Sequence, residues 1–134
     1  MELGLIKLPK IVDERGNLTF LQAGLQVPFE IKRAFWIYDV PGGEMRGGHA
    51  FKEQNEIIIA LSGSFDVTVK DKNGVEHKYS LNRSYTALFI PNLSWRHLDN
   101  FSTNAVALHL VDMEYTSTDY IRDANQFDTL CKKR

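Results

Sequence analysis

The chain has little cysteine, almost no net charge and no long apolar run. Cys131 is its single cysteine, so it cannot form a disulfide within the chain, as is usual for proteins of reducing compartments. Sixteen basic and 17 acidic residues give a net charge of −1, which provides no field to attract nucleic acid. No apolar stretch approaches the roughly 20 residues of a membrane-spanning helix, and the N-terminus lacks a signal-peptide core. These absences predict a cytoplasmic protein that binds neither nucleic acid nor membrane.

Length and composition predict one folded domain. The chain has 134 residues, of which 43% are hydrophobic and 25% charged, and both fractions are ordinary for a globular protein. This length is enough to bury a core without disulfides. We therefore expect residues 1–134 to form a single domain.

Apolar residues repeat mostly with a period of two. Phe65, Val67 and Val69 alternate with polar residues, as in a strand with one buried face. Residues 57–61 and 87–90 are continuous apolar runs, as in strands that are buried on both faces. Many short strands separated by turn signals favour an all-β sandwich or barrel.

Three local segments add detail. Asn73-Gly74 lies between two alternating runs and predicts a type I′ hairpin turn, in which both residues have positive φ. Residues 118–133 have apolar side chains at rough helical spacing, which predicts one C-terminal helix with Thr118 or Asp119 as its N-cap. The apolar segment up to about Phe20 either completes its own sheet or crosses to a second copy, and we favour strand exchange in a homodimer.

One stretch of the chain carries a motif with regular spacing. Gly43, His49, Glu56 and Gly63 have the spacing of the first cupin motif. That motif reads glycine, five residues, His-x-His, three or four residues, glutamate, six residues, glycine. In this chain Phe51 occupies the position of the second histidine.

The second cupin motif is present only in part. Pro91 and Asn100 fit it, but Leu93 replaces its glycine and Arg96 replaces its histidine. A transition metal needs three or four converging imidazole, thiolate or carboxylate ligands. Because Phe51 and Arg96 cannot act as such ligands, we expect a cupin jelly roll, also called a double-stranded β-helix, that binds no metal.

Beyond these motifs, the chain resembles the dTDP-4-keto-6-deoxy-sugar 3,4-ketoisomerases, which are small WxcM-like cupins. The resemblance covers nearly the whole chain and rests on many short segments in the expected order. These segments are Asp13-x-Arg15-Gly16, residues 31–38, 46–50, 61–64 and 85–91, Trp95 with 100–102, and Tyr115 with 119–122.

The resemblance implies a metal-free cupin homodimer that needs no cofactor and binds a dTDP-linked sugar in the mouth of the barrel. It also implies movement of a ketone between C4 and C3 of the hexose by proton transfer through an enediol, in deoxysugar and polysaccharide biosynthesis. In the family two histidines of one segment carry the protons; here the first is His49 and the second is Phe51. Residues 49 and 51 of one strand share a face. Phe51 therefore places an apolar ring where the second imidazole would act, and the loss of such a group typically costs 10²–10⁴-fold in rate.

The consequences of this change stay open at the level of sequence. Glu56 could replace the missing histidine, residual isomerase activity could remain, or the chain could be a nucleotide-sugar-binding or regulatory protein without turnover. His97 is a poorer substitute because it follows Arg96 and should face away from it. A metal-dependent cupin oxygenase is disfavoured by Phe51 and Arg96. We favour the isomerase, because the segments of the resemblance that would bind an anion and a sugar around His49 are kept.

The expected site has two catalytic residues, His49 and Glu56. Arginine suits the recognition of a diphosphate, and aromatic rings suit stacking on a base or contact with a sugar. The expected substrate-binding residues are Arg15, Arg33, Arg46, Arg96, Trp36, Tyr38 and Trp95. Core packing is an equal alternative for the three aromatic residues. Arg96 is expected to meet Glu56 or a phosphate, and we interpret His109 as an interior polar group with satisfied hydrogen bonds.

Overall fold

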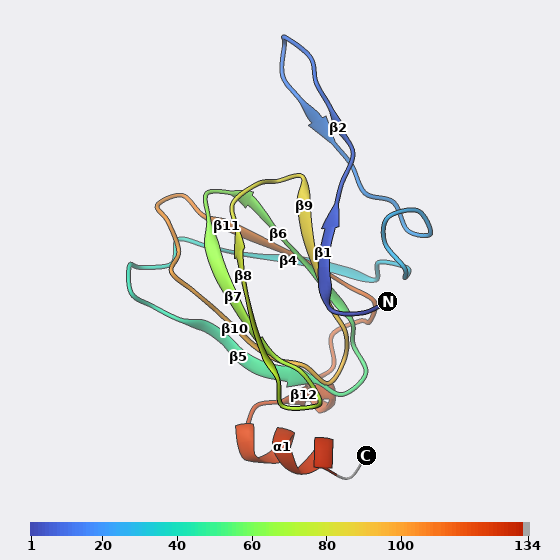
Figure 1. Ribbon diagram of the computed structural model, residues 1–134, viewed down its shortest axis with the longest axis vertical. Coiled ribbons are helices and arrows are strands. Elements are labelled where there is room, and N and C mark those ends of the chain that lie inside the picture. The colour runs from blue at the N-terminus through green and yellow to red at the C-terminus, as the bar shows by residue number, and fades with distance from the viewer. Residues whose placement is uncertain (133–134) are drawn as a thin grey trace.

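The computed structural model describes residues 1–132, and two five-stranded antiparallel sheets form its body (Figure 1). The first sheet has the order β1-β9-β6-β11-β4, with β1 at Gly4–Lys7, β9 at Thr86–Ile90, β6 at Glu56–Ser62, β11 at Val106–Val111 and β4 at Arg33–Tyr38. The second sheet has the order β12-β5-β10-β7-β8, with β12 at Tyr120–Ile121, β5 at Arg46–Phe51, β10 at Trp95–Asp99, β7 at Phe65–Lys70 and β8 at Glu76–Leu81. The two sheets enclose a common core, so the predicted all-β cupin jelly roll is confirmed.

The main core lies between the sheets because their inner faces are apolar. Phe65, Val67 and Val69 of β7 are at most 1% exposed and belong to one cluster with Ile58 of β6 and Leu88 of β9. Full burial of a side chain of this size contributes about 1.5–3 kcal/mol. The alternation predicted for β7 is therefore confirmed.

The first sheet buries apolar side chains on its outer face as well. Ile57 and Ile59 of β6 and Phe89 of β9 form an outer cluster with Val27, which lies in the segment before β4. Because both faces of β6 and β9 are covered, nearly every residue in them is apolar. This confirms the prediction that the continuous apolar runs are strands buried on both faces.

The turn between β7 and β8 differs in type from the prediction. The hairpin is present, and Gly74 has a φ of +82°, but Asn73 does not have a positive φ. The Asp71 side chain accepts hydrogen bonds from the N–H groups of Asn73 and Val75 at 2.9 and 3.0 Å. The type I′ prediction is wrong, because Asp71 organises a longer connection over residues 71–75 in which only the glycine has left-handed backbone.

The C-terminal segment contains more than the single helix predicted. Ser117–Asp119 form a short 3₁₀ helix (η1), β12 follows at Tyr120–Ile121, and helix α1 runs over Ala124–Lys132. The predicted start at Thr118 is wrong, because Thr118 lies in η1 and Tyr120–Ile121 then pair with β5 as an edge strand before the helix begins. Lys133, the predicted last helical residue, lies outside the described residues. Within residues 1–132, no helix is long and apolar enough to cross a membrane.

The N-cap of α1 also differs from the prediction. Asp123 precedes the helix, and its side chain accepts a hydrogen bond from the Asn125 N–H at 2.8 Å. This is the usual role of aspartate at a helix N-cap, where the first N–H groups lack partners within the helix. Thr118 and Asp119 lie within η1 and do not cap α1.

The N-terminal segment has two parts. Strand β1 pairs with β9 of its own chain, with Gly4 opposite Phe89. Strands β2 (Lys10–Ile11) and β3 (Leu18–Thr19) then form a separate hairpin that projects from the barrel (Figure 1). Ile11 and Val12 on this hairpin are 54% and 74% exposed. In the described chain the first strand completes its own sheet, and the hairpin pairs with neither barrel sheet.

Candidate active site

Arg96 and Glu56 form an ion pair inside the barrel. Arg96 belongs to β10 and Glu56 to β6, and they are 2% and 1% exposed. Nη2 of the guanidinium lies 3.1 Å from both carboxylate oxygens, and Nε lies 3.2 Å from Oε2. Buried charges need such pairing because their desolvation is expensive. The pairing expected for these two residues is confirmed, and it ties the two sheets together.

His109 of β11 completes the buried charged cluster. Its Nδ1 lies 3.0 Å from Glu56 Oε1, and its ring stacks on Phe35 with the centroids 4.5 Å apart. Burial alone would raise the pKa of Glu56, but the Arg96 charge and the His109 hydrogen bond together lower it to about 2. Glu56 is therefore ionised, and both of its carboxylate oxygens are hydrogen-bonded. This environment fits a structural role better than the proton-carrying role expected for Glu56.

A bulge in β5 brings Gly47 against Arg96. Arg96 lies opposite His49 and Leu98 lies opposite Arg46, so β5 has one more residue than β10 between these pairs. Gly47 has a φ of +75°, and its carbonyl oxygen accepts a hydrogen bond from Arg96 Nη1 at 3.1 Å. A Cβ at this position would collide with the same guanidinium. The glycine therefore provides both the backbone conformation and the space that Arg96 needs.

His49 has the environment of a neutral base. It lies on the interior side of β5, opposite Arg96. Burial, followed by the charge of Arg96, lowers the pKa of His49 to about 3. Its Nε2 is buried and has no hydrogen-bond partner among the described residues. A neutral imidazole with a free nitrogen inside a barrel can accept a proton from a bound molecule.

Two aromatic rings pack against His49. Phe51 and Tyr120 have ring centroids 4.9 and 5.1 Å from the imidazole. They are cross-strand partners on β5 and β12, and their own rings are 4.7 Å apart. The expectation that residues 49 and 51 share a face is confirmed, since their rings are in contact. Phe51 is 4% exposed, so its ring belongs to the interior beside His49.

Arg33 of β4 lines another side of the interior. Its Nη2 lies 3.5 Å from Gln54 Oε1, and its guanidinium carbon lies 5.0 Å from the Phe35 ring and 5.4 Å from the Tyr115 ring. Arg33 Nε and Gln54 Nε2 are buried without a partner in the described part of the chain. These two donors are therefore free to bind oxygen atoms of a ligand.

Asp119 fixes the loop that carries Gln54. This aspartate is 6% exposed, and its carboxylate accepts hydrogen bonds from the N–H groups of Glu53 and Gln54 at 2.9 and 3.2 Å. Its carbonyl oxygen accepts a third bond from the Lys52 N–H at 2.9 Å. The 3₁₀ turn thus determines where the β5–β6 loop enters the interior.

Arg46 lies at the rim of the barrel. It is exposed, and its cross-strand partner Leu98 belongs to the main core. Because cross-strand partners project from the same face of a sheet, Arg46 projects on the interior side. Its guanidinium makes no ion pair with another residue of the described chain, so it is available to a ligand at the barrel mouth.

Three aromatic residues expected to contact substrate lie on outer faces instead. Trp36 and Tyr38 are 57% and 59% exposed, and their neighbour Phe35 faces inward against His109. Trp95 packs 6.0 Å from Phe127 of α1, on the outer face of the second sheet. Within one chain these three side chains therefore do not line the interior that holds His49, because the alternation that directs Phe35 inward directs Trp36 and Tyr38 outward.

Arg15 is also remote from the interior of its own chain. It lies in the turn of the projecting hairpin and forms an ion pair with Asp13 at 3.0 Å, with 90% of its side chain exposed (Figure 1). Such exposed pairs are worth little energy. Arg15 therefore cannot bind a ligand beside His49 in the same chain in this position of the hairpin.

The structure also places residues at the site that the sequence did not single out. The sequence predicts a helix at Tyr120, because a strand of two residues is too short to show a period. Gln54 lies in a loop whose shape depends on Asp119, so no local pattern could locate it. His109, by contrast, was expected to be an interior group with satisfied hydrogen bonds. This is wrong for one of its nitrogens, since Nδ1 is bound to Glu56 but Nε2 is buried without a partner among the described residues. His97 lies 3.9 Å from Asp99 and follows Arg96 on the strand, facing away from it as expected.

Unpartnered nitrogen atoms distinguish this interior from an ordinary core. Buried polar groups are nearly always hydrogen-bonded, yet four buried side-chain nitrogens here have no partner among residues 1–132. They are Arg33 Nε, His49 Nε2, Gln54 Nε2 and His109 Nε2. No group of three or more His, Cys, Asp or Glu in this part of the chain has a metal-binding arrangement. The donor set suits proton transfer on a polar, negatively charged organic ligand.

The chain matches a known family over almost its whole length. Residues 1–132 match the family described as WxcM-like, C-terminal (FdtA). The chain is 34% identical over 127 residues to the TDP-4-oxo-6-deoxy-alpha-D-glucose-3,4-oxoisomerase of Aneurinibacillus thermoaerophilus, with 95% of this chain and 91% of that protein covered.

Solved structures of similar chains have the same fold. QdtA, a sugar 3,4-ketoisomerase from Thermoanaerobacterium thermosaccharolyticum in complex with TDP, superposes with a TM-score of 0.95 at 34% identity, covering 99% of this chain and 96% of that one. WlaRA, the TDP-fucose-3,4-ketoisomerase of Campylobacter jejuni, has a TM-score of 0.89 at 33% identity, covering 97% and 96%. This chain therefore belongs to the WxcM-like, C-terminal (FdtA) family and is similar throughout to nucleotide-sugar 3,4-ketoisomerases.

Proposed function

We propose that this chain is a 3,4-ketoisomerase that moves the keto group between C4 and C3 of a dTDP-linked 4-keto-6-deoxyhexose, in deoxysugar or polysaccharide biosynthesis. The observation that carries the proposal is His49, a neutral imidazole whose buried Nε2 has no partner in the described chain. The isomerisation requires a base that can reach two adjacent carbons of the sugar. The relatives described above bear the names of enzymes for this type of reaction.

In this proposal His49 takes the proton from C3 and returns it to C4. A base whose pKa is about 3 accepts protons weakly at neutral pH. The diphosphate of a bound dTDP-sugar would bring negative charge near the imidazole, and a nearby negative charge favours its protonated form. Substrate binding would thereby make His49 a stronger base at the moment when it is needed.

Two arginines are proposed to hold the nucleotide. Arg33 has a buried Nε without a partner in the described chain, and Arg46 is exposed at the rim without an ion pair there. Charge-assisted bonds of this kind are worth about 1.5–3 kcal/mol each. Arg96 is already bound to Glu56 and to the Gly47 carbonyl, so we assign it to the charge balance of the site rather than to direct binding.

Turnover is tested by following dTDP-4-keto-6-deoxyglucose with the purified protein by NMR in deuterated water. We expect the 3-keto isomer to appear, deuterium to enter the sugar carbons, and both to vanish in His49→Asn. Treatment with a metal chelator should leave the rate unchanged, since no step of this proton transfer uses a metal. If the wild-type protein gives neither product nor deuterium exchange, the isomerase proposal fails, and the non-catalytic nucleotide-sugar-binding alternative then depends on the binding test below.

Binding is tested separately by thermal unfolding with dTDP. A ligand that binds only the folded state raises the melting temperature. We expect a rise for wild type and a smaller rise for Arg33→Ala and Arg46→Ala. Lys72→Ala, which removes an exposed positive charge in the turn between β7 and β8, is the control. An unchanged melting curve with millimolar dTDP and other nucleoside diphosphates would exclude both the enzyme and the nucleotide-sugar-binding alternative.

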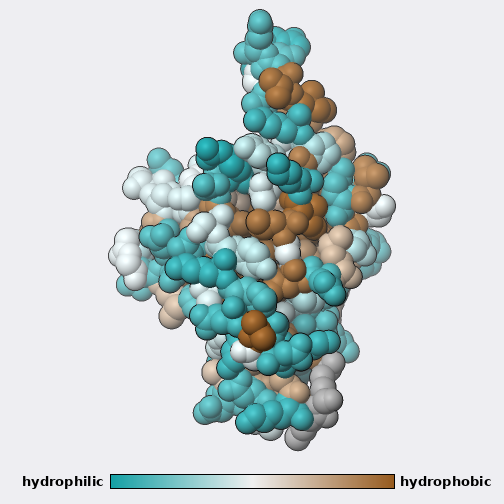
Figure 2. Space-filling view, viewed as in Figure 1, coloured by the Kyte–Doolittle hydropathy of each residue, from teal (hydrophilic) through white to brown (hydrophobic). Residues whose placement is uncertain are grey.

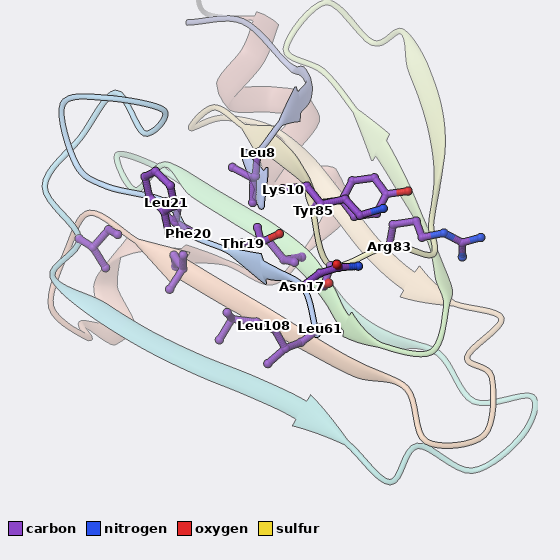
Figure 3. A pocket seen from close by; sticks show the side chains of 14 residues that line it. Leu8, Lys10, Asn17, Thr19, Phe20, Leu21, Leu61, Arg83, Tyr85 and Leu108 are labelled. Atoms are coloured by element: carbon purple, nitrogen blue, oxygen red, sulfur yellow. The ribbon is translucent and has the colours of Figure 1, made fainter. Parts of the chain in front are cut away.

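We also propose that two copies pair through the outer face of the first sheet. Figure 2 shows hydrophobic surface on the projecting hairpin and on the barrel below it. A groove of about 730 Å³ separates hairpin residues such as Phe20 from Leu61 and Leu108 on the strands (Figure 3). An exposed apolar area of this kind is typical of an interaction surface. An exchanged hairpin would also carry Arg15 away from its own barrel, which is how Arg15 could still reach a substrate.

The remaining parts of the proposal rest on composition. We propose that residues 1–134 act as one domain in the cytoplasm and that the protein needs no cofactor. The single cysteine and the near-zero net charge support this location and the absence of nucleic-acid partners.

A further inference from the structure

Phe51 leaves the proposed reaction with one proton carrier too few. The isomerisation moves a proton between two carbons, which His49 can do, and it also adds a proton to O4 and removes one from O3. Glu56 cannot serve the oxygens, because both of its own oxygens are bound and its pKa is lowered to about 2 by Arg96 and His109 against the effect of burial. Another described group must exchange protons with the sugar oxygens if turnover is fast.

Tyr120 lies where such a group is needed. It is the cross-strand partner of Phe51, so the two side chains project from the same face of the second sheet. Its ring is 5.1 Å from the His49 imidazole and 4.7 Å from the Phe51 ring. Its hydroxyl makes no hydrogen bond to another residue of the described chain. A phenol is both donor and acceptor, so this position offers an unused proton carrier directly beside residue 51.

Arg122 packs against the ring of Tyr120. The guanidinium carbon of Arg122 lies 4.3 Å from the ring centroid of Tyr120. A guanidinium over an aromatic ring is attracted to it, so this contact helps to fix the orientation of the Tyr120 side chain. Because Arg122 follows Tyr120 by only two residues, the local backbone places the guanidinium beside the ring.

We propose that the Tyr120 hydroxyl is the second proton carrier of this enzyme and replaces the histidine that Phe51 lacks. The inference rests on the proposed isomerase function. His49 Nε2 removes the proton from C3, the C3–C4 double bond forms, and the electrons of the C4 carbonyl move to O4. Tyr120 donates its proton to O4, which gives the neutral enediol.

The second half of the reaction restores both residues. The Tyr120 phenolate removes the proton from O3 as the C3 carbonyl forms, and C4 takes the proton from the His49 imidazolium. The CH(OH)–C=O unit becomes C=O–CH(OH), His49 ends neutral and Tyr120 ends protonated. No electron leaves or enters the sugar, so no oxidant or reductant is required.

Other side chains fit this role less well. Tyr115 is 60% exposed and contacts Tyr120 at 5.7 Å, on the side of Arg33. His109 is fully buried, with one ring face covered by Phe35 and Nδ1 engaged by Glu56. Of these, only Tyr120 contacts both His49 and residue 51.

The test compares three variants in the NMR assay with dTDP-4-keto-6-deoxyglucose. Tyr120→Phe removes only the hydroxyl, and we expect turnover to fall on the order of 10²-fold or more, with the melting temperature and its rise with dTDP unchanged. The matched control is Tyr79→Phe on β8, at the opposite edge of the second sheet, which should keep wild-type turnover. The double variant Tyr120→Phe with Phe51→His restores a proton carrier at the neighbouring position and should recover at least roughly tenfold.

The outcomes separate this inference from the function on which it rests. An active wild type with an equally active Tyr120→Phe overturns the role of Tyr120 and leaves the isomerase intact. A Tyr120→Phe variant that loses the response to dTDP and is not rescued by Phe51→His assigns the tyrosine to packing and also overturns the inference. An inactive wild type removes the isomerase function and this inference with it.

Discussion

Arg96 is 2% exposed, and its charge depends on Glu56 and on the carbonyl oxygen of Gly47. An arginine in this position would be prohibitively costly in a barrel lined only by hydrocarbon. The substitution of the cupin histidine is therefore tied to two other features, a glycine with positive φ at position 47 and a carboxylate at position 56. The substitution by Arg96 therefore depends on both of these residues, and the three act as one unit.

We predict that Arg96→Met destabilises the fold by about 3–5 kcal/mol, because it leaves the Glu56 carboxylate buried without its cation. Urea unfolding monitored by tryptophan fluorescence measures the effect. Arg46→Met makes the same change at the exposed rim and should alter the free energy of unfolding by only about 0.5 kcal/mol. Equal stability of Arg96→Met and wild type would mean that Glu56 is neutral in the folded protein.

The low pKa of His49 predicts a pH dependence of stability. In the unfolded chain this imidazole takes up its proton near pH 6.5, whereas in the folded protein burial and Arg96 delay protonation to about pH 3. Between these values the unfolded state binds more protons, so the free energy of unfolding falls as the pH is lowered through this window. We expect His49→Asn to lose less stability than wild type between about pH 7 and 5.

Urea unfolding across this range checks the prediction, with His97→Asn as the control, since His97 lies on the partly exposed outer side of β10. Parallel stability curves for wild type and His49→Asn would contradict it. The measurement is independent of turnover, so it tests the buried state of His49 even if no substrate is converted.

At the scale of elements, short connecting structures position the site. The η1 turn and β12 together occupy only Ser117–Ile121, yet they fix the β5–β6 loop through Asp119 and place Tyr120 beside His49. The bulge in β5 similarly returns Arg46 to the interior side. The regular strands form the barrel, and these irregular segments position several of the side chains that line the candidate site.

We predict that Asp119→Ala costs about 1–3 kcal/mol, because two backbone N–H groups lose a charged acceptor. Asp128→Ala removes an exposed ion pair with Lys70 and should cost less than about 1 kcal/mol. Hydrogen exchange should show faster exchange of the Glu53 and Gln54 amides in Asp119→Ala alone. Unchanged protection of both amides would show that the loop is held by other contacts.

At the scale of the whole molecule, the first sheet has an apolar outer face that its own chain covers only in part. Trp36, Tyr38 and Leu61 are each more than half exposed on this face, while the outer cluster around Ile59 is covered by the segment before β4. A second copy is the occupant we propose for the uncovered area.

We predict that the wild-type protein sediments with about twice the chain mass of 15.4 kDa. Trp36→Glu places a charge in the proposed contact and should shift the equilibrium to the monomer. The control Val75→Glu also charges an exposed apolar position, in the turn between β7 and β8, and should remain dimeric. A monomeric wild type at high micromolar concentration would contradict the proposed interface.

The sequence alone determined the architecture and the chemical type of the site, because both depend on local patterns. Period-two alternation predicted β7, continuous apolar runs predicted β6 and β9, and the spacing from Gly43 to Gly63 predicted the cupin barrel and the position of His49 in it. The pairing of Arg96 with Glu56 was also predictable, since two ligand positions of one site must converge wherever the barrel forms.

Only the tertiary structure decided which neighbouring side chains complete the site. Trp36 and Tyr38 lie on β4, which lines the site, but their side chains project from its outer face. A shift of one residue in register would exchange the inward and outward positions of this strand. Tyr120 and Gln54 reach the interior through a two-residue strand and an Asp119-bound loop, whose conformations arise from contacts about 65 residues apart in the chain. Such contacts leave no periodic signal in the sequence, because the backbone partners of Asp119 are the same for any residue type.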